Sequence, residues 1–416
     1  MDEEHDVLDT TQLCYEGGFD EQVANLLKSV RLTRQEVENL SQLFDDLEGA
    51  LQNTWPGCRV IPFGSIVTGM GIRTSDVDCY IELPSFVLRK RSLVVTARNV
   101  LGKYPQIFQN LFAVVSAKVP IVKLHHVPTN RHCDVNFHSV TGVRNTKLLA
   151  FLLHLDKRAL TLAIIIKYWS KVHAITGTNL MPSYAMMHLV IFYLQQEKVL
   201  PPICELQKHV PPEITDHWNT AFDDRTPYVS CNNKSLYHLL GGFFKFYNKF
   251  NFFESVISMY EGRALNKKEF ENVDRVSDIY YLYKDNVRKD YCKMLRIDSY
   301  MCVQDPFELN RNLTVAVYPK LTQRILDYFK SASSAYENET RNNFLKVILT
   351  RTHKDDFLVK PKTFNDHEAL LQKQKLINRP HARKKGFKSN KFNKKAFKNR
   401  FTIMFEQLHQ KKAGKS

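Results

Sequence analysis

Several features of secreted, membrane-bound and zinc-binding proteins are missing from this sequence of 416 residues. No apolar run approaches the roughly 20 residues that a membrane-spanning helix needs; the stretch 160–166 is short. The eight cysteines include no C-x-x-C pair, which indicates neither a zinc site nor a disulfide framework. The acidic start, residues 1–6, resembles neither a secretory signal nor an Arg-rich mitochondrial presequence. We therefore expect a reduced, intracellular protein, cytoplasmic or nuclear rather than secreted or mitochondrial.

Acidic residues are scarce only at one end of the chain. The net charge is +16, but residues 373–416 hold fifteen Lys and Arg against one acid, which leaves only +2 for residues 1–372. Hydrophobic residues make up 44% and charged ones 25%, a composition typical of a globular protein long enough for two domains. In the basic segment lysines alternate with phenylalanines. This pattern suits RNA phosphates and stacked bases, and equally a nuclear-import signal or a solvated extension.

The most informative motif is Gly64 and Ser65, followed by the carboxylates Asp76 and Asp78. The five residues before Gly64 predict a short strand, and unpaired N–H groups beyond such a strand attract phosphate oxygens. The five residues after Asp78 predict a second strand, on which Asp76 and Asp78 project from one face. Carboxylates this close repel each other unless a cation lies between them, and Mg²⁺ carried by a nucleoside triphosphate is a suitable one. Each part alone is common, but the combination resembles the nucleotidyltransferase fold of the polymerase β superfamily.

A third carboxylate is expected on a neighbouring strand, because a two-metal site needs a ligand for the catalytic ion alone. The segments 120–124 and 133–137 predict a pair of strands, and Asp134 lies on the polar face of the second one. Asp134 is therefore the third candidate ligand, although an ordinary carboxylate on a solvated strand face gives the same pattern. The three carboxylates would hold two Mg²⁺ (or Mn²⁺) ions. One ion would lower the pKa of an RNA 3′-hydroxyl, and the other would clamp the triphosphate.

The rest of the chain predicts a small α/β palm followed by a mainly helical domain, an α+β fold. Helical spacing of apolar residues is found over 19–52, and a further helix is expected over 89–104. Later helices, the first of them broken near Asp156, are expected over 148–173, 184–196, 235–248, 251–260, 319–331 and 337–349. The expected divisions are N-terminal helices packed on the central domain (1–54), a nucleotidyltransferase palm with a mixed sheet (55–143), a helical central domain with the nucleotide-recognition motif (144–350), a linker (351–372) and a basic low-complexity tail (373–416).

With its helical region included, the chain resembles the noncanonical poly(A)/poly(U) polymerases, the terminal RNA nucleotidyltransferases, over about residues 20–350. Beyond the palm motifs, the matching segments are 144–146, 167–171, 182–185, 239–244 and 304–312. The resemblance implies a polymerase β-like palm joined to a poly(A)-polymerase-type central domain. It also implies template-independent, two-metal-ion addition of nucleotides to single-stranded RNA 3′ ends, with release of pyrophosphate. The glycines and aromatic residues of 239–244 are interpreted as helix packing rather than as a site.

The resemblance also assigns a nucleotide site. Lys167 and Lys171 are four apart, so they share a helix face and can present two ammonium groups to the β- and γ-phosphates. By similarity Ser183 contacts the triphosphate, Tyr184 stacks on the base, and Asn145 reads the ribose 2′-hydroxyl, since an amide can both donate and accept. Structural alternatives are a solvated helix edge for the lysines and an ordinary core aromatic for Tyr184.

The base-recognition segment departs from the family pattern. In uridine-specific members a histidine commonly precedes the final asparagine, where this chain has Arg311 before Asn312. Arg only donates hydrogen bonds and uracil O4 only accepts them, whereas adenine N6 and cytosine N4 donate. UTP is therefore the expected substrate and ATP the alternative, although guanine O6 also accepts and Arg311 could grip RNA instead. By resemblance Asp305 accepts a hydrogen bond from the base, directly or through water, with Glu308 nearby.

Two other classes of function compete with this interpretation. A non-catalytic RNA-binding scaffold with an inherited fold is disfavoured, because the acidic trio is complete. A cyclic-dinucleotide or 2′-5′ oligoadenylate synthase is disfavoured by the match at 304–312. The expected partners are single-stranded RNA 3′ ends and a nucleoside triphosphate, without a membrane. The sequence does not identify a protein adaptor, the RNA substrate or the oligomeric state.

Overall fold

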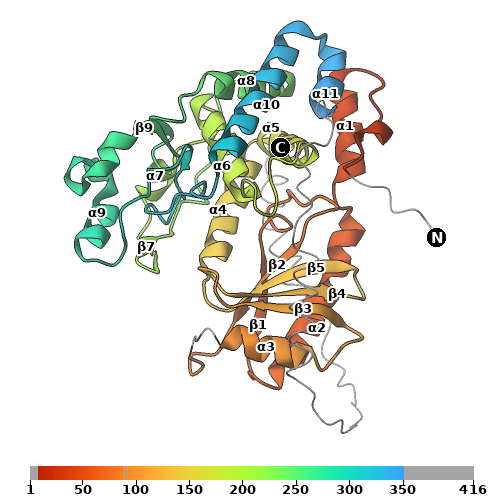
Figure 1. The fold of residues 1–416 in the computed structure, drawn as a ribbon, viewed down its shortest axis with the longest axis vertical. Coiled ribbons are helices and arrows are strands. Elements are labelled where there is room, and N and C mark those ends of the chain that lie inside the picture. The colour runs from red at the N-terminus through yellow and green to blue at the C-terminus, as the bar shows by residue number, and fades with distance from the viewer. Residues whose placement is uncertain (1–7, 89, 91, 351–416) are drawn as a thin grey trace. The chain divides into compact units, whose positions relative to one another are not determined.

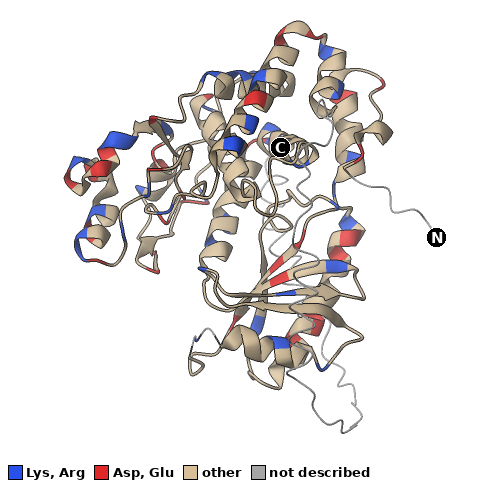
Figure 2. Cartoon of the chain, in the orientation of Figure 1, with Lys and Arg blue, Asp and Glu red and all other residues tan. Residues whose placement is uncertain are grey.

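The computed structural model describes residues 8–88, 90 and 92–350, which are called the described residues below. They belong almost entirely to the first of two compact units, Met1–Leu349 and Thr350–Ser416. The predicted linker and basic tail lie outside the described residues, so their expected roles stay predictions. In the described part of the chain, no helix is both long and apolar enough to cross a membrane. Figure 2 shows acidic and basic residues interspersed over the helices and strands of this part.

The palm is built on a five-stranded mixed sheet of order β1-β2-β5-β4-β3 (Figure 1). Its strands are β1 (Arg59–Phe63), β2 (Val77–Glu82), β3 (Phe108–Val114), β4 (Ile121–His126) and β5 (Arg131–Asn136). β2 and β5 run parallel, and the other neighbouring strands run antiparallel. On β2 the side chains of Val77 and Cys79 are buried, which leaves Asp78 on the opposite face. The strands expected before Gly64 and around Asp134 are confirmed.

Helices cover the palm and continue into the helical region. The helices are α1 (Phe19–Val30), α2 (Arg34–Gln52), α3 (Leu93–Leu101), α4 (Thr141–Leu155), α5 (Lys157–Val172), α6 (Ser183–Gln196), α7 (Ile203–Gln207), α8 (Leu236–Lys249), α9 (Tyr281–Arg288), α10 (Pro319–Asn338) and α11 (Arg341–Leu349). The smaller strands are β6 (Ile214–Thr215), β7 (Trp218–Asn219), β8 (Ser255–Ser258), β9 (Arg263–Asn266) and β10 (Cys302–Val303). The α+β fold expected from the sequence is confirmed. The predicted break near Asp156 is also confirmed, because its backbone is extended and its carboxylate accepts the Arg158 N–H at 2.8 Å to begin α5.

One predicted helix is wrong, and another begins later than predicted. Residues 251–260 hold strand β8, which pairs with β9 and with the distant β10. Its β-branched Val256 and Ile257 are buried there. The segment 337–349 is divided, because α10 continues to Asn338 and α11 begins only at Arg341. Of the two N-terminal helices, α1 contacts α5 and α11 of the helical region, whereas α2 contacts β1 and α3 of the palm.

Two glycines of α8 allow close helix packing, as the interpretation of 239–244 proposed. A Cβ atom added to Gly241 would overlap the ring of Tyr336 on α10. We expect Gly241→Ala to lower the free energy of unfolding by about 1–3 kcal/mol through overpacking, measured by denaturant titration. Gly49→Ala on α2 is the matched control, because an added Cβ there meets nothing within 4 Å. The control should raise stability by about 0.5–1 kcal/mol; equal stabilities of the two variants would contradict the packing argument.

Candidate active site

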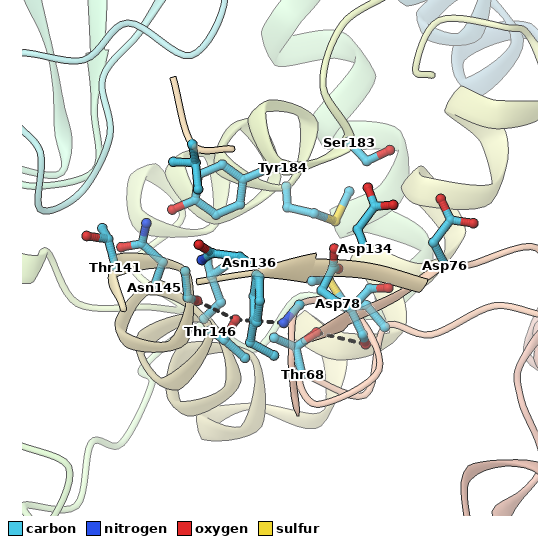
Figure 3. A pocket seen from close by; sticks show the side chains of 18 of the residues that line it. Thr68, Asp76, Asp78, Asp134, Asn136, Thr141, Asn145, Thr146, Ser183 and Tyr184 are labelled. Carbon is cyan, nitrogen blue, oxygen red and sulfur yellow. Dashed lines mark hydrogen bonds between the residues drawn. The ribbon is translucent and has the colours of Figure 1, made fainter. Parts of the chain in front are cut away.

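The three candidate carboxylates gather where β2 and β5 run side by side. Asp78 and Asp134 are direct partners in the parallel register of these strands. Figure 3 shows Asp76, Asp78 and Asp134 together on one side of a pocket. Lys123 of β4 is the register partner of Asp134, and its Nζ donates to both carboxylate oxygens at 2.7 and 3.0 Å. The sheet register thus places two carboxylates and one ammonium group side by side, and Asp76 joins them from the residue before β2.

These carboxylates are electrostatically crowded. Burial, followed by the charges of Asp134 and Asp76, raises the pKa of Asp78 to about 7. Burial also raises the pKa of Asp134, although its hydrogen bonds from Lys123 act in the opposite direction. Such hard oxygen donors suit Mg²⁺, and a divalent cation would relieve their repulsion. Over residues 8–350 without 89 and 91, however, no three His, Cys, Asp or Glu side chains already form a metal centre.

The turn after β1 brings the backbone against the carboxylates. Gly64 has φ +78°, and an added Cβ would overlap the carboxylate of Asp78, so only glycine fits here. The Gly64 N–H donates to Thr146 Oγ1 at 2.8 Å. Thr68 closes the turn by donating from Oγ1 to the Ser65 carbonyl oxygen at 3.1 Å. The turn is therefore fixed on both sides before any ligand arrives.

The two lysines of α5 extend toward the loop that precedes Asp76. Lys167 is buried, and its Nζ donates to the Met70 carbonyl at 3.0 Å and to Ser75 Oγ at 2.9 Å. Burial, together with the nearby charge of Lys171, lowers the pKa of Lys167 to about 7. Burial lowers the pKa of Lys171 as well. The alternative of a solvated helix edge is therefore wrong for Lys167.

Two polar groups in the pocket lack a partner. The Tyr184 hydroxyl and the Asn145 carboxamide oxygen are buried, and neither forms a hydrogen bond with another described residue. Tyr184 is held by the ring of His188, whose centroid lies 4.2 Å away in an edge-on arrangement. Burial, followed by the charge of Asp305, raises the pKa of Tyr184 well above its ordinary value, so the phenol stays neutral. Buried polar atoms of this kind are usually satisfied, so their position points to a polar ligand.

The segment 304–312, which the sequence predicts to recognise the base, follows β10 and is organised by Asp305. This residue is fully buried, and its Oδ1 accepts the backbone N–H groups of Phe307 and Glu308 at 3.0 Å each. Arg311 Nη1 lies 3.0 Å from Glu308 Oε2 and 3.8 Å from Asp305 Oδ2. Burial raises the pKa of Asp305 to about 6, against the opposing charge of Arg311. Across the pocket, Lys118 of the β3–β4 loop lies 3.1 Å from Glu308 Oε2 and links the palm to this loop.

Asn312 at the end of the motif is structural. Its Nδ2 donates to the Arg296 carbonyl at 2.9 Å and to Ser299 Oγ at 2.7 Å. Its Oδ1 accepts the Thr314 N–H at 2.9 Å. Asn312 therefore fixes the loop on the side away from the pocket and leaves the preceding Arg311 free to face it.

One cavity of about 520 Å³ gathers the predicted site. All candidate residues line it except Asp305, which lies behind Arg311; the lining candidates are Gly64, Ser65, Asp76, Asp78, Asp134, Asn145, Lys167, Lys171, Ser183, Tyr184, Glu308 and Arg311. The volume suits a nucleotide-sized ligand. The sequence reasoning assigned no role to the lining residues Lys118 and Thr141 or to Lys123, the partner of Asp134. No local pattern singles out Lys118 or Thr141; Lys123 could have been found by pairing the two predicted strands.

Comparisons with known proteins agree with this architecture. Residues 19–153 match the family described as "Poly(A) RNA polymerase, mitochondrial-like, central palm domain", and residues 235–311 match the "Cid1 family poly A polymerase". The chain is 27% identical over 377 residues to the speckle targeted PIP5K1A-regulated poly(A) polymerase of Danio rerio, covering 80% of this chain and 46% of the relative. It is 28% identical over 313 residues to terminal uridylyltransferase 4 of Mus musculus, and this match covers 71% of this chain and 18% of the relative. The chain thus spans less than half the length of these two relatives.

Solved structures show the same fold. The apo form of mtPAP has a TM-score of 0.69 at 18% identity. The match covers 82% of this chain and 74% of the mtPAP chain. A structure of the Cid1 poly(U) polymerase has a TM-score of 0.63 at 24% identity. The match covers 77% of this chain and 95% of the Cid1 chain. These likenesses establish the polymerase β-like nucleotidyltransferase fold. Because a palm family and a Cid1-type family match in this order along the chain, and adenylyl- and uridylyl-named relatives both align with it, the protein belongs to the noncanonical poly(A)/poly(U) polymerase family.

Proposed function

We propose that this protein is a template-independent RNA 3′-terminal nucleotidyltransferase. The observation that carries the proposal is the register pairing of Asp78 with Asp134 in a cavity that also holds Lys167 and Lys171. Carboxylates next to one buried and one partly buried ammonium group suit a ligand that combines a divalent metal with a triphosphate. The names of the aligned relatives, a poly(A) polymerase and a uridylyltransferase, support the same reaction class.

The carboxylates of Asp76, Asp78 and Asp134 would hold Mg²⁺ or Mn²⁺. When bound, such ions lower the pKa of an attacking hydroxyl and neutralise charge on a leaving pyrophosphate. One Cid1 structure contains Mg with 3′-dATP, and one mtPAP structure contains UTP. In the present chain Asp134 would face the RNA 3′-hydroxyl, and Lys123 would hold its carboxylate in position.

The remaining cavity residues would bind the nucleotide. Lys167, Lys171 and Ser183 would bind the β- and γ-phosphates, and the Asn145 amide would bind the ribose 2′-hydroxyl. Tyr184 would stack on the base. The orphaned carboxamide oxygen of Asn145 supports its assignment, because a bound nucleotide would give this atom a hydrogen-bond partner.

We further propose UTP as the preferred nucleotide. Arg311 lines the cavity as a donor-only group, and Glu308 at 3.0 Å holds its guanidinium. A donor-only group suits uracil O4 and repels an amino group such as adenine N6. Asp305 lies behind Arg311, so we assign it to positioning Arg311 and the loop rather than to direct contact with the base. The alternative is ATP, which the poly(A)-polymerase relatives favour.

Extension of a labelled single-stranded RNA with Mg²⁺ and each nucleoside triphosphate alone tests the proposal. Extension with UTP in clear preference to the other three is the expected result. Extension with ATP alone would support the proposed reaction class but show that ATP, not UTP, is the substrate. Extension with none of the four would reject the enzyme assignment in favour of an RNA-binding scaffold. Reactions without RNA control for synthesis of cyclic or 2′-5′-linked products.

The proposed role of Lys167 predicts a pH dependence. Its pKa near 7 means that the ammonium form, which a triphosphate needs, is lost as pH rises above 7. The KM for the nucleotide should therefore rise about fivefold between pH 7 and pH 8, as expected for a single deprotonation. Lys167→Met, which keeps the volume but carries no charge, should have a high KM that does not change over this range. A wild-type KM that is constant from pH 7 to pH 9 would contradict this role.

A further inference from the structure

Two buried oxygen atoms near the proposed base site have no hydrogen-bond partner. The Tyr184 hydroxyl can donate a hydrogen bond, and Asp305 Oδ2 can accept one. Both atoms are buried, and neither forms a hydrogen bond with another described residue. A buried polar atom without a partner lowers stability, so a donor and an acceptor left unpaired in one region call for an explanation. The ring of Tyr184 is assigned to stacking, and its hydroxyl has no role in the proposal above.

The two atoms belong to elements that pack against each other. Tyr184 is in the first turn of α6, and α6 contacts β10, the strand that leads into the segment 304–312. Tyr184, Glu308 and Arg311 line the same cavity. Burial is the main cause of the raised pKa of Tyr184, and the charge of Asp305 is the next. Asp305 also acts on this phenol as a hydrogen-bonding group, but the two side chains fall short of hydrogen-bond geometry. A small closing movement would join them.

The rest of each side chain is already held. Asp305 Oδ1 accepts two backbone N–H groups of its own segment, and the Asp305 N–H donates to the Arg311 carbonyl at 2.9 Å. The ring of Tyr184 packs edge-on against His188, whose Nδ1 donates to the Tyr184 carbonyl at 2.7 Å. This leaves the Tyr184 hydroxyl and Asp305 Oδ2 available for a contact between α6 and the segment 304–312.

Arg311 is a second neighbour of Asp305 Oδ2. Its Nη1 is 3.8 Å away, which is an ion-pair contact but not a hydrogen bond. Nη1 instead binds Glu308 Oε2 at 3.0 Å, and Arg311 lines the cavity. If the Tyr184 hydroxyl donates to Oδ2, this oxygen is satisfied and the guanidinium stays turned toward the cavity. One hydrogen bond would therefore hold both the segment and Arg311 in position at the base.

We propose that the Tyr184 hydroxyl is a positioning group, which donates to Asp305 Oδ2 when a nucleotide binds and so closes the segment 304–312 on the base. This inference rests on the proposed function and adds a closing movement to nucleotide binding. A base stacked on the ring draws Arg311 toward its own acceptor oxygen, and Oδ2 is then left to the hydroxyl. Figure 3 shows Tyr184 on the side of the pocket remote from Asp76. The closure should therefore affect nucleotide affinity rather than the chemical step.

Steady-state kinetics and melting of Tyr184→Phe test this role. The variant keeps the stacking ring and loses only the hydroxyl. Its KM for the nucleotide should rise about tenfold, the lower end for losing a hydrogen bond to a charged group, while kcat and the KM for RNA stay unchanged. Without nucleotide its melting temperature should equal or exceed that of the wild type, because an unpaired buried hydroxyl is removed. A lower melting temperature would show a structural hydroxyl and overturn the proposal.

Tyr193→Phe is the matched control. Tyr193 is also on α6, its hydroxyl is also buried and unpaired among the described residues, and it lies outside the cavity. Burial, followed by the charge of Glu197, raises its pKa, much as burial and Asp305 raise that of Tyr184. The control should resemble Tyr184→Phe in melting and the wild type in every kinetic constant.

Hydrogen exchange measures the closure without turnover. When UTP and Mg²⁺ are added without RNA, exchange of the Phe307 and Glu308 N–H groups, which Asp305 binds, should slow in the wild type. The slowing should be clearly smaller in Tyr184→Phe, at nucleotide concentrations that saturate both proteins. Equal slowing in both would overturn the proposal. ATP replaces UTP in these tests if the extension assay selects ATP.

Asp305→Asn identifies the acceptor. Asparagine keeps one oxygen for the backbone N–H groups but presents an amide group, which cannot accept, in place of Oδ2. Adding Tyr184→Phe to this variant should raise the nucleotide KM no further. Additive increases, or an unchanged KM in Tyr184→Phe alone, would overturn the proposal and leave the proposed function standing. A wild type that binds no nucleoside triphosphate and extends no RNA would overturn both.

Discussion

Replacing Asp78 with Asn should abolish RNA extension and make the protein more stable. The loss of activity should exceed about a thousandfold, because a metal-binding carboxylate stabilises transition-state charge by several kcal/mol. The gain in stability follows from the electrostatics of the ligand-free site. Burial and the charges of Asp134 and Asp76 raise the pKa of Asp78 from 3.8 to about 7, so the folded protein disfavours its ionised form.

The pH dependence of this gain has a definite sign. A carboxyl group whose pKa is raised on folding lowers stability as pH increases from its unfolded value toward its folded value. The penalty is therefore absent below about pH 4 and complete above about pH 7. Asp78→Asn should raise the free energy of unfolding by about 1–3 kcal/mol at pH 8 and by little at pH 4.

Denaturant unfolding at both pH values, beside the RNA extension assay, checks this prediction. Asp327→Asn is a suitable control, since this exposed residue of α10 accepts a hydrogen bond from Gln323 at 2.9 Å and lies outside the cavity. The control should match the wild type in activity and stability. A folded Asp78→Asn variant that still extends RNA at the wild-type rate would remove Asp78 from the metal site. If Asp78→Asn were less stable than the wild type at pH 8, only the electrostatic argument would be contradicted, and the metal-site assignment would stand.

Local sequence patterns were sufficient for the palm. The strand carrying Asp134 was predictable because apolar and polar residues alternate along it, and the strand before Gly64 because a short apolar run ends at a glycine. Asp78 lies on β2 as predicted, and Asp76 directly precedes that strand. The break at Asp156 was also readable, since a capping carboxylate interrupts a long apolar pattern. The nucleotide residues of the helical region were assigned through the family resemblance, and the structure brings all of them but Asp305 into one cavity.

The features that could not be predicted from the sequence depend on contacts between residues far apart in the chain. The apolar residues Val256 and Ile257 fit a helix or a strand locally, and only their pairing with β9 and with Cys302–Val303 makes them a strand. The contact of Lys118 with Glu308 joins residues 190 positions apart, which no local pattern can reveal. The burial of Asp305 likewise depends on the packing of its whole loop.

Replacing Arg311 with Ala should change which nucleotide is used. Burial alone would lower the pKa of Arg311, but the charges of Asp305 and Glu308 raise it above its ordinary value, so the guanidinium stays charged. Removing this donor should lower kcat/KM for UTP by about 10- to 100-fold, the range for losing one specific polar contact to a base. The value for ATP should stay constant or increase, because adenine N6 no longer meets a group that only donates. The ratio of UTP to ATP use should therefore fall.

Two further variants separate base recognition from loop structure. Arg311→Lys keeps the charge but loses the planar fork, so it should retain part of the preference for UTP. Glu308→Gln releases both Arg311 and Lys118, which Glu308 binds at 3.0 and 3.1 Å. This variant should weaken the preference for UTP although residue 311 is still an arginine. If Arg311→Ala instead raised the KM for RNA and kept the nucleotide ratio constant, Arg311 would contact the RNA rather than the base. The preference for UTP would then need another donor in the cavity, and Lys118, which also lines it and binds Glu308, is one candidate.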